Sequence, residues 1–200
     1  MNNIPKKLKE KIEQTQDVYG VKPVDCFISK IDGTRKYLFE LYDGNIIESV
    51  LMKYKHGNSV CISSQAGCRM GCKFCASTLG GLDRNLTPSE MLSQIYYIQR
   101  DTGERVSNVV MMGTGEPMDN YDNVLRFLEL ITSENGLNIS QRNITISTCG
   151  IVPKIKELAE KEKAAGLKAV TDGELRRRYW HLDFLASLVG VEEILSLIHI

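Results

Sequence analysis

The chain of 200 residues is 42% hydrophobic and 25% charged, as expected for one soluble globular domain or for a domain and a fragment. Its 25 basic and 25 acidic residues cancel, so composition gives no signature of nucleic-acid binding, and no apolar run approaches the ~20 residues that span a bilayer. Six cysteines without a secretory signal favour metal binding or catalysis over disulfides and predict a cytoplasmic protein.

The first third of the chain is predicted to form a helix followed by an antiparallel meander. A short polar helix is expected over Pro5–Gln16, after which apolar and polar residues alternate from residue 24 to residue 63. Asp32-Gly33 and Asp43-Gly44 separate the alternating runs, and Asp-Gly in such a place is a strong signal for a hairpin. We therefore expect three antiparallel strands, with Val60–Ser63 as a further strand.

After residue 75, strands are predicted to alternate with helices, which indicates a parallel sheet. Thr87-Pro88-Ser89-Glu90 has the sequence of a capping box and predicts a helix that ends near Thr102. The candidate core residues of this helix are Met91, Leu92, Ile95, Tyr96 and Ile98. The elements expected after it are a strand over Asn108–Gly113, a helix over Asn123–Glu134, a strand over Asn143–Ser147 and a helix from Pro153.

Three cysteines, Cys68, Cys72 and Cys75, form a C-x3-C-x2-C motif. A structural zinc takes four protein ligands, and an electron-transfer [4Fe–4S] cluster takes four thiolates. Three thiolates in one short loop can instead bind three corners of a [4Fe–4S] cluster and leave the fourth iron open to a substrate or cofactor. A partial zinc site and three buried thiols are the alternatives, and the spacing favours the cluster.

A glycine-rich turn, Gly113-Thr114-Gly115-Glu116-Pro117, follows the apolar residues Val109–Met112 of the strand predicted after the capped helix. In α/β folds, turns at the carboxyl ends of parallel strands are where ligands bind. The Glu116 carboxylate can accept hydrogen bonds from an ammonium group, and glycine lets the backbone approach a ligand closely. The turn alone is weak evidence for a site, because Gly/Pro turns are common.

The cysteine motif, with Phe74 before its last cysteine, resembles the loop of the radical-SAM enzymes. In that superfamily the open iron of a [4Fe–4S] cluster binds S-adenosylmethionine (SAM), and one electron from the cluster cleaves SAM to a 5′-deoxyadenosyl radical. The resemblance implies that the three cysteines hold such a cluster and that the Gly115-Glu116 pair contacts SAM. It also implies an α/β fold in which the antiparallel β meander precedes an incomplete partial (β/α)6 barrel.

The resemblance becomes specific to one family within the superfamily through three further segments, Val60–Cys68, Arg84–Thr87 and Asn108–Pro117. Across residues 2–160 the chain resembles the 23S rRNA and tRNA adenine-C2 methyltransferases, the RlmN-type enzymes. The C2 carbon of adenine is a poor nucleophile, so its methylation requires radical chemistry that a cofactor supplies. The resemblance implies 23S rRNA and tRNA as substrates, a flavodoxin-type electron donor and a monomeric protein without a membrane partner.

The resemblance also implies roles for single residues. Glu48 matches the proton acceptor of the family, Cys61 matches the cysteine that frees the product through a disulfide, and Ser147 matches a contact with SAM. Without the resemblance, Glu48 is an ordinary exposed strand carboxylate, Cys61 a core cysteine and Ser147 the end of a strand. Cys26 and Cys149 match no role and are expected to be structural, and the Met111-Met112 pair is expected in the core.

The chain departs from the family after residue 160. In the family a second, C-terminal cysteine carries the methyl group, but no cysteine follows Cys149 here, so we expect this chain to be inactive. Residues 161–200 resemble a segment of cobalamin-independent methionine-synthase-like proteins, which favours a truncated or chimeric reading frame over a divergent helical tail. The expected organisation is 1–63, 64–160 and 161–200. The alternatives are an adenine-C8 methyltransferase, another radical-SAM enzyme, or a non-catalytic fragment that binds the cluster and SAM.

Overall fold

The computed structural model describes residues 5–7, 10, 20–55 and 57–164 of the chain. The helix expected over Pro5–Gln16 falls mostly outside these residues, as does most of the tail 161–200, so both stay predictions. The boundaries proposed at residues 63 and 160 also stay predictions. Among the described helices, none combines the length and the apolar character needed to cross a membrane.

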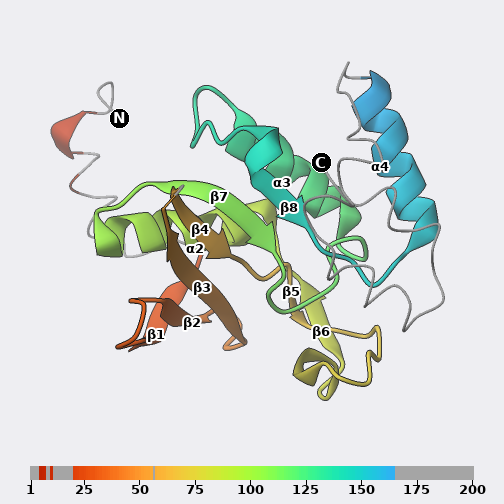
Figure 1. Cartoon of the computed structure of the whole chain (residues 1–200), viewed down its shortest axis with the longest axis horizontal. Coiled ribbons are helices and arrows are strands. Elements are labelled where there is room, and N and C mark those ends of the chain that lie inside the picture. The colour runs from red at the N-terminus through yellow and green to blue at the C-terminus, as the bar shows by residue number, and fades with distance from the viewer. Residues whose placement is uncertain (1–4, 8–9, 11–19, 56, 165–200) are drawn as a thin grey trace.

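A mixed six-stranded sheet with the order β1-β2-β3-β4-β7-β8 forms the centre of the fold (Figure 1). Its antiparallel part consists of β1 (Lys22–Ile28), β2 (Arg35–Glu40), β3 (Ile46–Tyr54) and β4 (Gly57–Cys61). The strands β7 (Val106–Met111) and β8 (Ile144–Ile146) continue the sheet parallel to β4. The predicted meander is therefore confirmed, and both Asp-Gly pairs lie in the turns that connect its strands.

Helices connect the parallel strands, as the alternating pattern predicts. Helix α2 (Pro88–Thr102) precedes β7, α3 (Tyr121–Thr132) lies between β7 and β8, and α4 (Val152–Ala164) follows β8. At the start of α2 the Thr87 side chain accepts a hydrogen bond from the Glu90 amide, and the Glu90 carboxylate accepts one from the Thr87 amide. The capping box and the end of α2 at Thr102 are thus confirmed, whereas α3 begins and ends two residues earlier than predicted.

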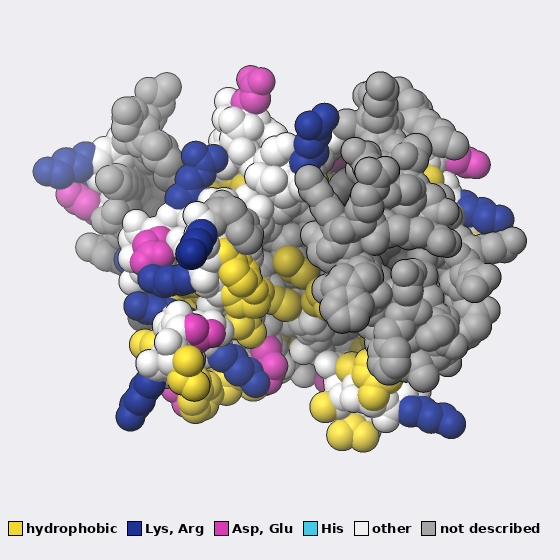
Figure 2. All heavy atoms as spheres, viewed as in Figure 1, with side chains coloured by type: hydrophobic (Ala, Val, Ile, Leu, Met, Phe, Trp, Pro, Cys, Tyr) yellow, Lys and Arg dark blue, Asp and Glu magenta, His cyan; other side chains and the backbone are white. Residues whose placement is uncertain are grey.

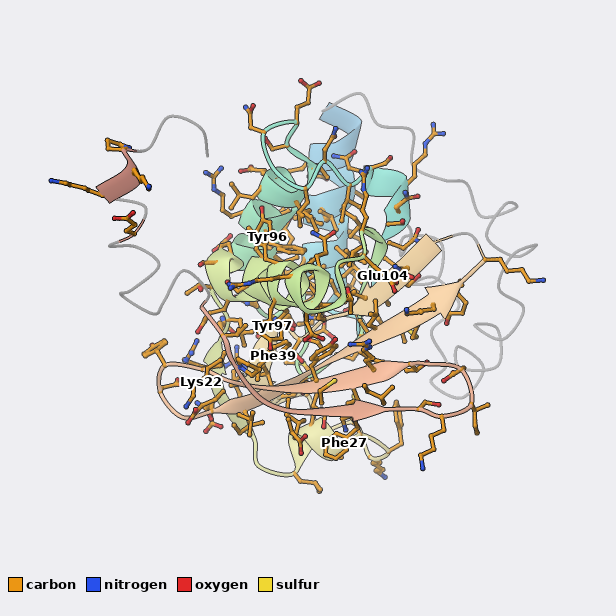
Figure 3. The ribbon with its side chains drawn as sticks, turned by 90° about the vertical axis from the view of Figure 1, so that its left-hand side faces the viewer. Lys22, Phe27, Phe39, Tyr96, Tyr97 and Glu104 are labelled. Carbon is orange, nitrogen blue, oxygen red and sulfur yellow. The ribbon has the colours of Figure 1, made fainter. Side chains whose placement is uncertain are left out.

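The core lies between the sheet and the helices α2 and α3. Alternate residues of the strands, such as Phe39, Ile47 and Val109, share this core with residues of the helices, and the rings of Phe39 and Tyr97 meet edge to face at 5.3 Å. Figure 3 shows Phe39 and Tyr97 between α2 and the sheet, with Phe27 of the edge strand β1 on the far side. Of the predicted core of α2, Met91, Ile95 and Ile98 are fully buried and Leu92 partly, but Tyr96 is exposed.

The intervening strand residues point to the other face of the sheet. Val50 lies opposite Cys61, Cys61 opposite Val110, and Val110 opposite Thr145, and all four side chains are partly exposed. Because side chains alternate along a strand, Met112 would share this face with Val110, and it is exposed. The pair of methionines is therefore split: Met111 is in the core as predicted, and Met112 is not.

Candidate cofactor site

The site predicted from the sequence lies at the carboxyl ends of the three parallel strands β4, β7 and β8. The segment after β4 leads into the cysteine loop, the glycine-rich turn follows β7, and Ser147 follows β8. Hydrogen bonds join these segments, because the Ser147 amide donates to the Met111 carbonyl oxygen at 3.3 Å and the Cys149 amide to Oε2 of Glu116 at 2.6 Å. The structure thus brings the three segments together at the edge where α/β folds bind ligands.

A two-stranded ribbon that the sequence did not predict carries the cysteine loop. Strands β5 (Gln65–Gly67) and β6 (Leu82–Asn85) pair antiparallel, and the loop 68–81 projects from their ends (Figure 1). The Cys68 amide closes the base of the loop by donating to the Gly81 carbonyl oxygen at 2.7 Å. Gly67 has a φ of 73°, and a Cβ there would lie 2.1 Å from the same oxygen, so only glycine permits this closure.

The three thiols of the motif lie in this loop and none is in a disulfide. Cys68 is buried, Cys72 and Cys75 are half-buried, and the Cys75 amide donates to the Cys72 carbonyl oxygen at 3.0 Å. Burial raises the pKa of the Cys68 thiol; the backbone of Met70 opposes this, and the nearby negative groups, with Glu116 foremost, add to the rise. The thiols therefore share one region of the molecule.

The number of thiols in the loop matches the three corners of a [4Fe–4S] cluster that has one open iron. In the described part of the chain, no three His, Cys, Asp or Glu side chains converge closely enough to hold one metal ion. A mononuclear zinc site needs its ligands around a single point, whereas each thiolate of a [4Fe–4S] cluster binds a different iron. Three spaced thiols in one loop therefore suit three corners of a cluster.

The glycine-rich turn after β7 lies directly against the segment that enters the cysteine loop. The Gly113 amide donates to the Ile62 carbonyl oxygen at 3.0 Å, and the amides of Ser64 and Gln65 donate to the Thr114 carbonyl oxygen at 2.9 and 3.1 Å. A Cβ on Gly115 would lie 2.5 Å from the Cβ of Gln65, and its φ is 107°. Gly115 is thus required for the close approach of the two segments, and its predicted contact with SAM stays a prediction.

Glu116 ties this turn to the segment after β8. Its side chain is buried, Oε1 accepts a hydrogen bond from the Met118 amide at 2.9 Å, and Oε2 accepts the one from Cys149. A carboxylate oxygen can accept more than one hydrogen bond, so both oxygens retain acceptor capacity for an ammonium group. Desolvation and the charge of Glu116 together raise the pKa of the Cys149 thiol to about 12. The thiol is exposed, its amide lies against Glu116, and its expected structural role stays a prediction.

Glu48 and Cys61 lie on the face of the sheet opposite to α2 and α3, near the same edge. Glu48 is exposed and forms an ion pair with Lys36 at 2.7 Å, as an ordinary strand carboxylate does. Cys61 is half-buried and lies opposite Val50, so Glu48, two residues before Val50, is diagonal to Cys61 across the two strands. Residues in this arrangement lie about 7–8 Å apart. Burial raises the pKa of Cys61, the backbone of Met112 opposes this, and the charge of Glu48 adds to the rise. The two side chains are neighbours, and their roles stay predictions.

Sequence reasoning missed a group of buried polar side chains behind the site. Oε1 of Gln94 accepts hydrogen bonds from the Ser49 hydroxyl at 2.7 Å and from the Ser63 amide at 2.9 Å, and its Nε2 donates to the Ser63 carbonyl oxygen. The Ser63 hydroxyl donates to the Glu48 carbonyl oxygen and accepts from the Thr114 amide. The available signal was the position of Gln94 within the apolar stripe of α2, where a polar residue must find buried partners.

A family model described as the Radical SAM superfamily matches residues 62–172, more than half of the chain. The chain belongs to the radical SAM superfamily. Its cofactors are accordingly a [4Fe–4S] cluster and SAM. The match covers the cysteine loop, the glycine-rich turn and Ser147, which are the parts that the fold brings together at one edge of the sheet.

Individual relatives carry a more specific name. The chain is 59% identical over 198 residues to a probable dual-specificity RNA methyltransferase RlmN of Lachnospira eligens, covering 97% of this chain and 55% of that protein. A protein of the same name from Lachnoclostridium phytofermentans is 65% identical over 161 residues, 80% of this chain and 45% of the relative. The crystal structure of a radical SAM methyltransferase from Sphaerobacter thermophilus matches with a TM-score of 0.72 at 40% identity, covering 79% of this chain and 47% of that one. The chain thus spans about half the length of the relatives it matches.

Proposed function

We propose that the chain is the cofactor-binding part of a radical-SAM methyltransferase that methylates C2 of adenine in 23S rRNA and tRNA. The observation that carries the proposal is that the segment entering the cysteine loop lies against the glycine-rich turn, at the carboxyl ends of β4, β7 and β8. The RNA substrate is supported by the names of relatives that are 59% and 65% identical to the chain. The proposal includes a flavodoxin-type electron donor, a monomeric state and a cytoplasmic location.

In this proposal the cluster and SAM are held by residues of different segments. Cys68, Cys72 and Cys75 bind three irons of the cluster, while the backbone at Gly115, the Glu116 carboxylate and Ser147 hold SAM. Together the two cofactors supply the one-electron chemistry that the unreactive C2 carbon requires. The contribution of the protein is positional, because Glu116 is fixed by two backbone amides and can orient the ammonium group of SAM without moving.

Glu48 and Cys61 are proposed to act on the RNA adduct from the face of the sheet opposite to α2 and α3. The Glu48 carboxylate would accept the proton that leaves C2, and it is exposed enough to reach a base laid on this face. The Cys61 thiolate would then attack the sulfur of the second cysteine, through which the RNA is attached. The S–S bond would form as the bond from that sulfur to the methylene carbon breaks, and the released carbon would take up a proton to become the methyl group. Burial raises the pKa of the Cys61 thiol, so its proton would have to be removed for this attack.

We further propose that a protein made of these 200 residues alone binds both cofactors but does not methylate RNA. The second cysteine of the proposed reaction has to lie after Cys149, and the 200 residues contain none there. Such a protein would hold the cluster and SAM without the thiol that receives the methyl group. Cofactor binding and methylation are therefore separate claims with separate tests.

Cofactor binding is tested by anaerobic reconstitution with iron and sulfide, followed by EPR of the reduced protein with and without SAM. We expect a [4Fe–4S] signal that changes when SAM is added, and its loss in Cys72→Ser. Cys26→Ser is the matched control, because Cys26 lies exposed on the edge strand β1, and it should leave the signal unchanged. A folded protein without a cluster, or with a cluster that does not respond to SAM, would contradict the proposal.

Methylation is tested with reductant, SAM and RNA. We expect no methylated adenine from the 200-residue chain, and 2-methyladenine from a version extended by the C-terminal part of the Lachnospira eligens relative. Methylated adenine from the unextended chain would contradict the proposed inactivity, and 8-methyladenine from the extended one would contradict the C2 assignment.

A further inference from the structure

A charged pair joins the cysteine loop to the turn after β7. Arg69 lies between Cys68 and Cys72, and its Nε and one terminal nitrogen donate to the two carboxylate oxygens of Asp119 at 3.0 and 2.6 Å. The Asp119 side chain is 10% exposed, while that of Arg69 is 62% exposed. A bidentate pair of this kind fixes direction as well as distance, because both planar groups have to align.

Gln65 extends this pair to the backbone of Glu116. The Gln65 side chain is fully buried in β5, and its Oε1 accepts a hydrogen bond from the Glu116 amide at 2.7 Å. Its Nε2 donates to Oδ2 of Asp119 at 3.0 Å and to Oδ1 of Asn85 in β6 at 2.7 Å. Arg69, Asp119, Gln65 and the backbone of Glu116 therefore form one continuous network, which we call the loop–turn network.

The cysteine loop projects into solvent, so the loop–turn network is needed to hold it in place. Within the loop, Phe74 and Leu79 are each 88% exposed, and Figure 2 shows a group of hydrophobic side chains at the lower right, where the loop projects. These two side chains thus gain little packing within the described part of the chain, and the Arg69–Asp119 pair anchors the half of the loop between Cys68 and Cys72. Burial would raise the pKa of Asp119, but the bonds from Arg69 and Gln65 outweigh it and hold that pKa below its usual range.

We propose that the Arg69–Asp119 pair couples the position of the cysteine loop to the SAM-binding turn, so that loss of the pair weakens SAM binding to the cluster-loaded protein. The inference rests on the proposed cofactor site and adds Arg69 and Asp119 to it as positioning residues. Coupling between two sites is reciprocal in free energy, so a change in the turn must also affect the loop. Asp119 would therefore position the cysteine loop although it follows the glycine-rich turn and lies far from the cysteine motif in the sequence.

The experiment compares Arg69→Gln, Asp119→Asn and the double variant after anaerobic reconstitution. Asparagine keeps one acceptor oxygen for Gln65, removes the negative charge and replaces the second oxygen with an NH2 group that cannot accept from Arg69. The control is Arg126→Gln, because Arg126 of α3 is 61% exposed and forms a 2.7 Å ion pair with Glu129 away from the site. The measured quantities are the iron content and the SAM dissociation constant of each cluster-loaded protein by equilibrium dialysis.

We expect each single variant to raise the SAM dissociation constant about fivefold, the low end of typical coupling between sites. The double variant should show no more than the larger single effect, because two residues that act as one pair are not additive. Reduced iron content in Asp119→Asn, with Arg126→Gln unaffected, would support the coupling from the side of the turn.

Three results would overturn the inference. Unchanged SAM affinity in both single variants would mean that the pair does not couple the cysteine loop to the SAM-binding turn. Additive effects in the double variant would mean that Arg69 and Asp119 act separately. If Arg69→Gln alone lost iron and Asp119→Asn kept its SAM affinity, Arg69 would stabilise the cysteine loop without coupling it to the turn. A cluster-loaded wild-type protein that binds SAM keeps the proposed function in all three cases, whereas a wild-type protein that takes up no iron overturns that function and the coupling with it.

Discussion

The antiparallel meander and the carboxyl ends of the parallel strands are stabilised by different kinds of contact. In the meander, Tyr37 and Phe39 pack against Tyr97 of α2, and ion pairs such as Lys22–Glu40 lie exposed on the surface. At the other region, buried amide side chains have defined partners on several segments. Asn120, for example, donates to the carbonyl oxygens of Ser64 and Leu86, both at 2.8 Å.

This difference follows from what each region has to do. Apolar packing has no direction, so it stabilises the meander without fixing the positions of its rings, and a few hydrogen bonds such as that from the Tyr37 hydroxyl to Asp101 add direction there. Buried hydrogen bonds are directional and unfavourable when unmade, so they define the relative positions of the segments that hold the cofactors. Substitutions of similar size should therefore have unequal effects in the two regions.

The largest effect is expected for Gln94→Met, which keeps the length of the side chain and removes its polar atoms. The Ser63 amide, the Ser63 carbonyl and the Ser49 hydroxyl would lose a buried partner, and each such loss costs about 1–3 kcal/mol. We expect the free energy of unfolding to fall by about 3 kcal/mol in urea titrations. A fall below about 1 kcal/mol would show that these groups find other partners.

A smaller effect is expected for Ile47→Val in the meander. Ile47 is fully buried opposite Phe39, and the loss of one methylene typically costs about 1 kcal/mol in such a place. The same urea titrations provide the measurement, and reconstituted cluster content should remain that of the wild type. An effect as large as that of Gln94→Met would remove the proposed difference between the two regions.

The ion pair between Arg84 of β6 and Asp43 of the β2–β3 turn should make the stability of the protein depend on pH in the acid range. The hydrogen bond from Arg84 is the main reason that the pKa of Asp43 falls from 3.8 to about 2. A pKa lowered on folding stabilises the protein fully above 3.8, and this contribution is lost as the pH falls towards 2. Between these values the urea midpoint of the wild type should therefore fall more steeply than that of Asp43→Asn, and parallel curves would argue against the contact.

The smallest effect is expected for Lys22→Gln. The pair that Lys22 forms with Glu40 is solvent-exposed at the sheet edge, and such pairs contribute little because water screens both charges. No measurable change in the urea midpoint is expected at physiological salt. A clear destabilisation would mean that the meander also depends on directional contacts.

The sequence predicted those parts of the fold that follow from local patterns. The Asp-Gly turns, the capping box at Thr87 and the alternation of strands and helices each depend on neighbours in sequence, and each was correct. The ribbon of β5 and β6 was missed because its strands have 3 and 4 residues, too short to show a period. Tyr96 was expected in the core because it continues an apolar run, but its position around the helix directs it to solvent.

The sequence indicated the segments of the candidate site but not the contacts between them. The cysteine spacing and the Gly-Glu pair point to their segments without any structure, and the fold places these segments together. The Arg69–Asp119 pair spans 50 residues of sequence, and nothing local in either residue indicates the other. The hydrogen bond from the Cys149 amide to Glu116 likewise spans 33 residues and forms only when β7 and β8 pair.

The closed base of the cysteine loop makes residues 68–81 an exchangeable insert. Both ends of this segment leave the ribbon side by side, so a loop of different length could replace it without shifting the register of β4 and β7. The exchange would have to retain Gly67, since any side chain there would force the two ends apart. Other metal-binding loops could therefore be grafted onto the ends of β5 and β6. The residues at the carboxyl ends of the parallel strands would then line one side of the new site.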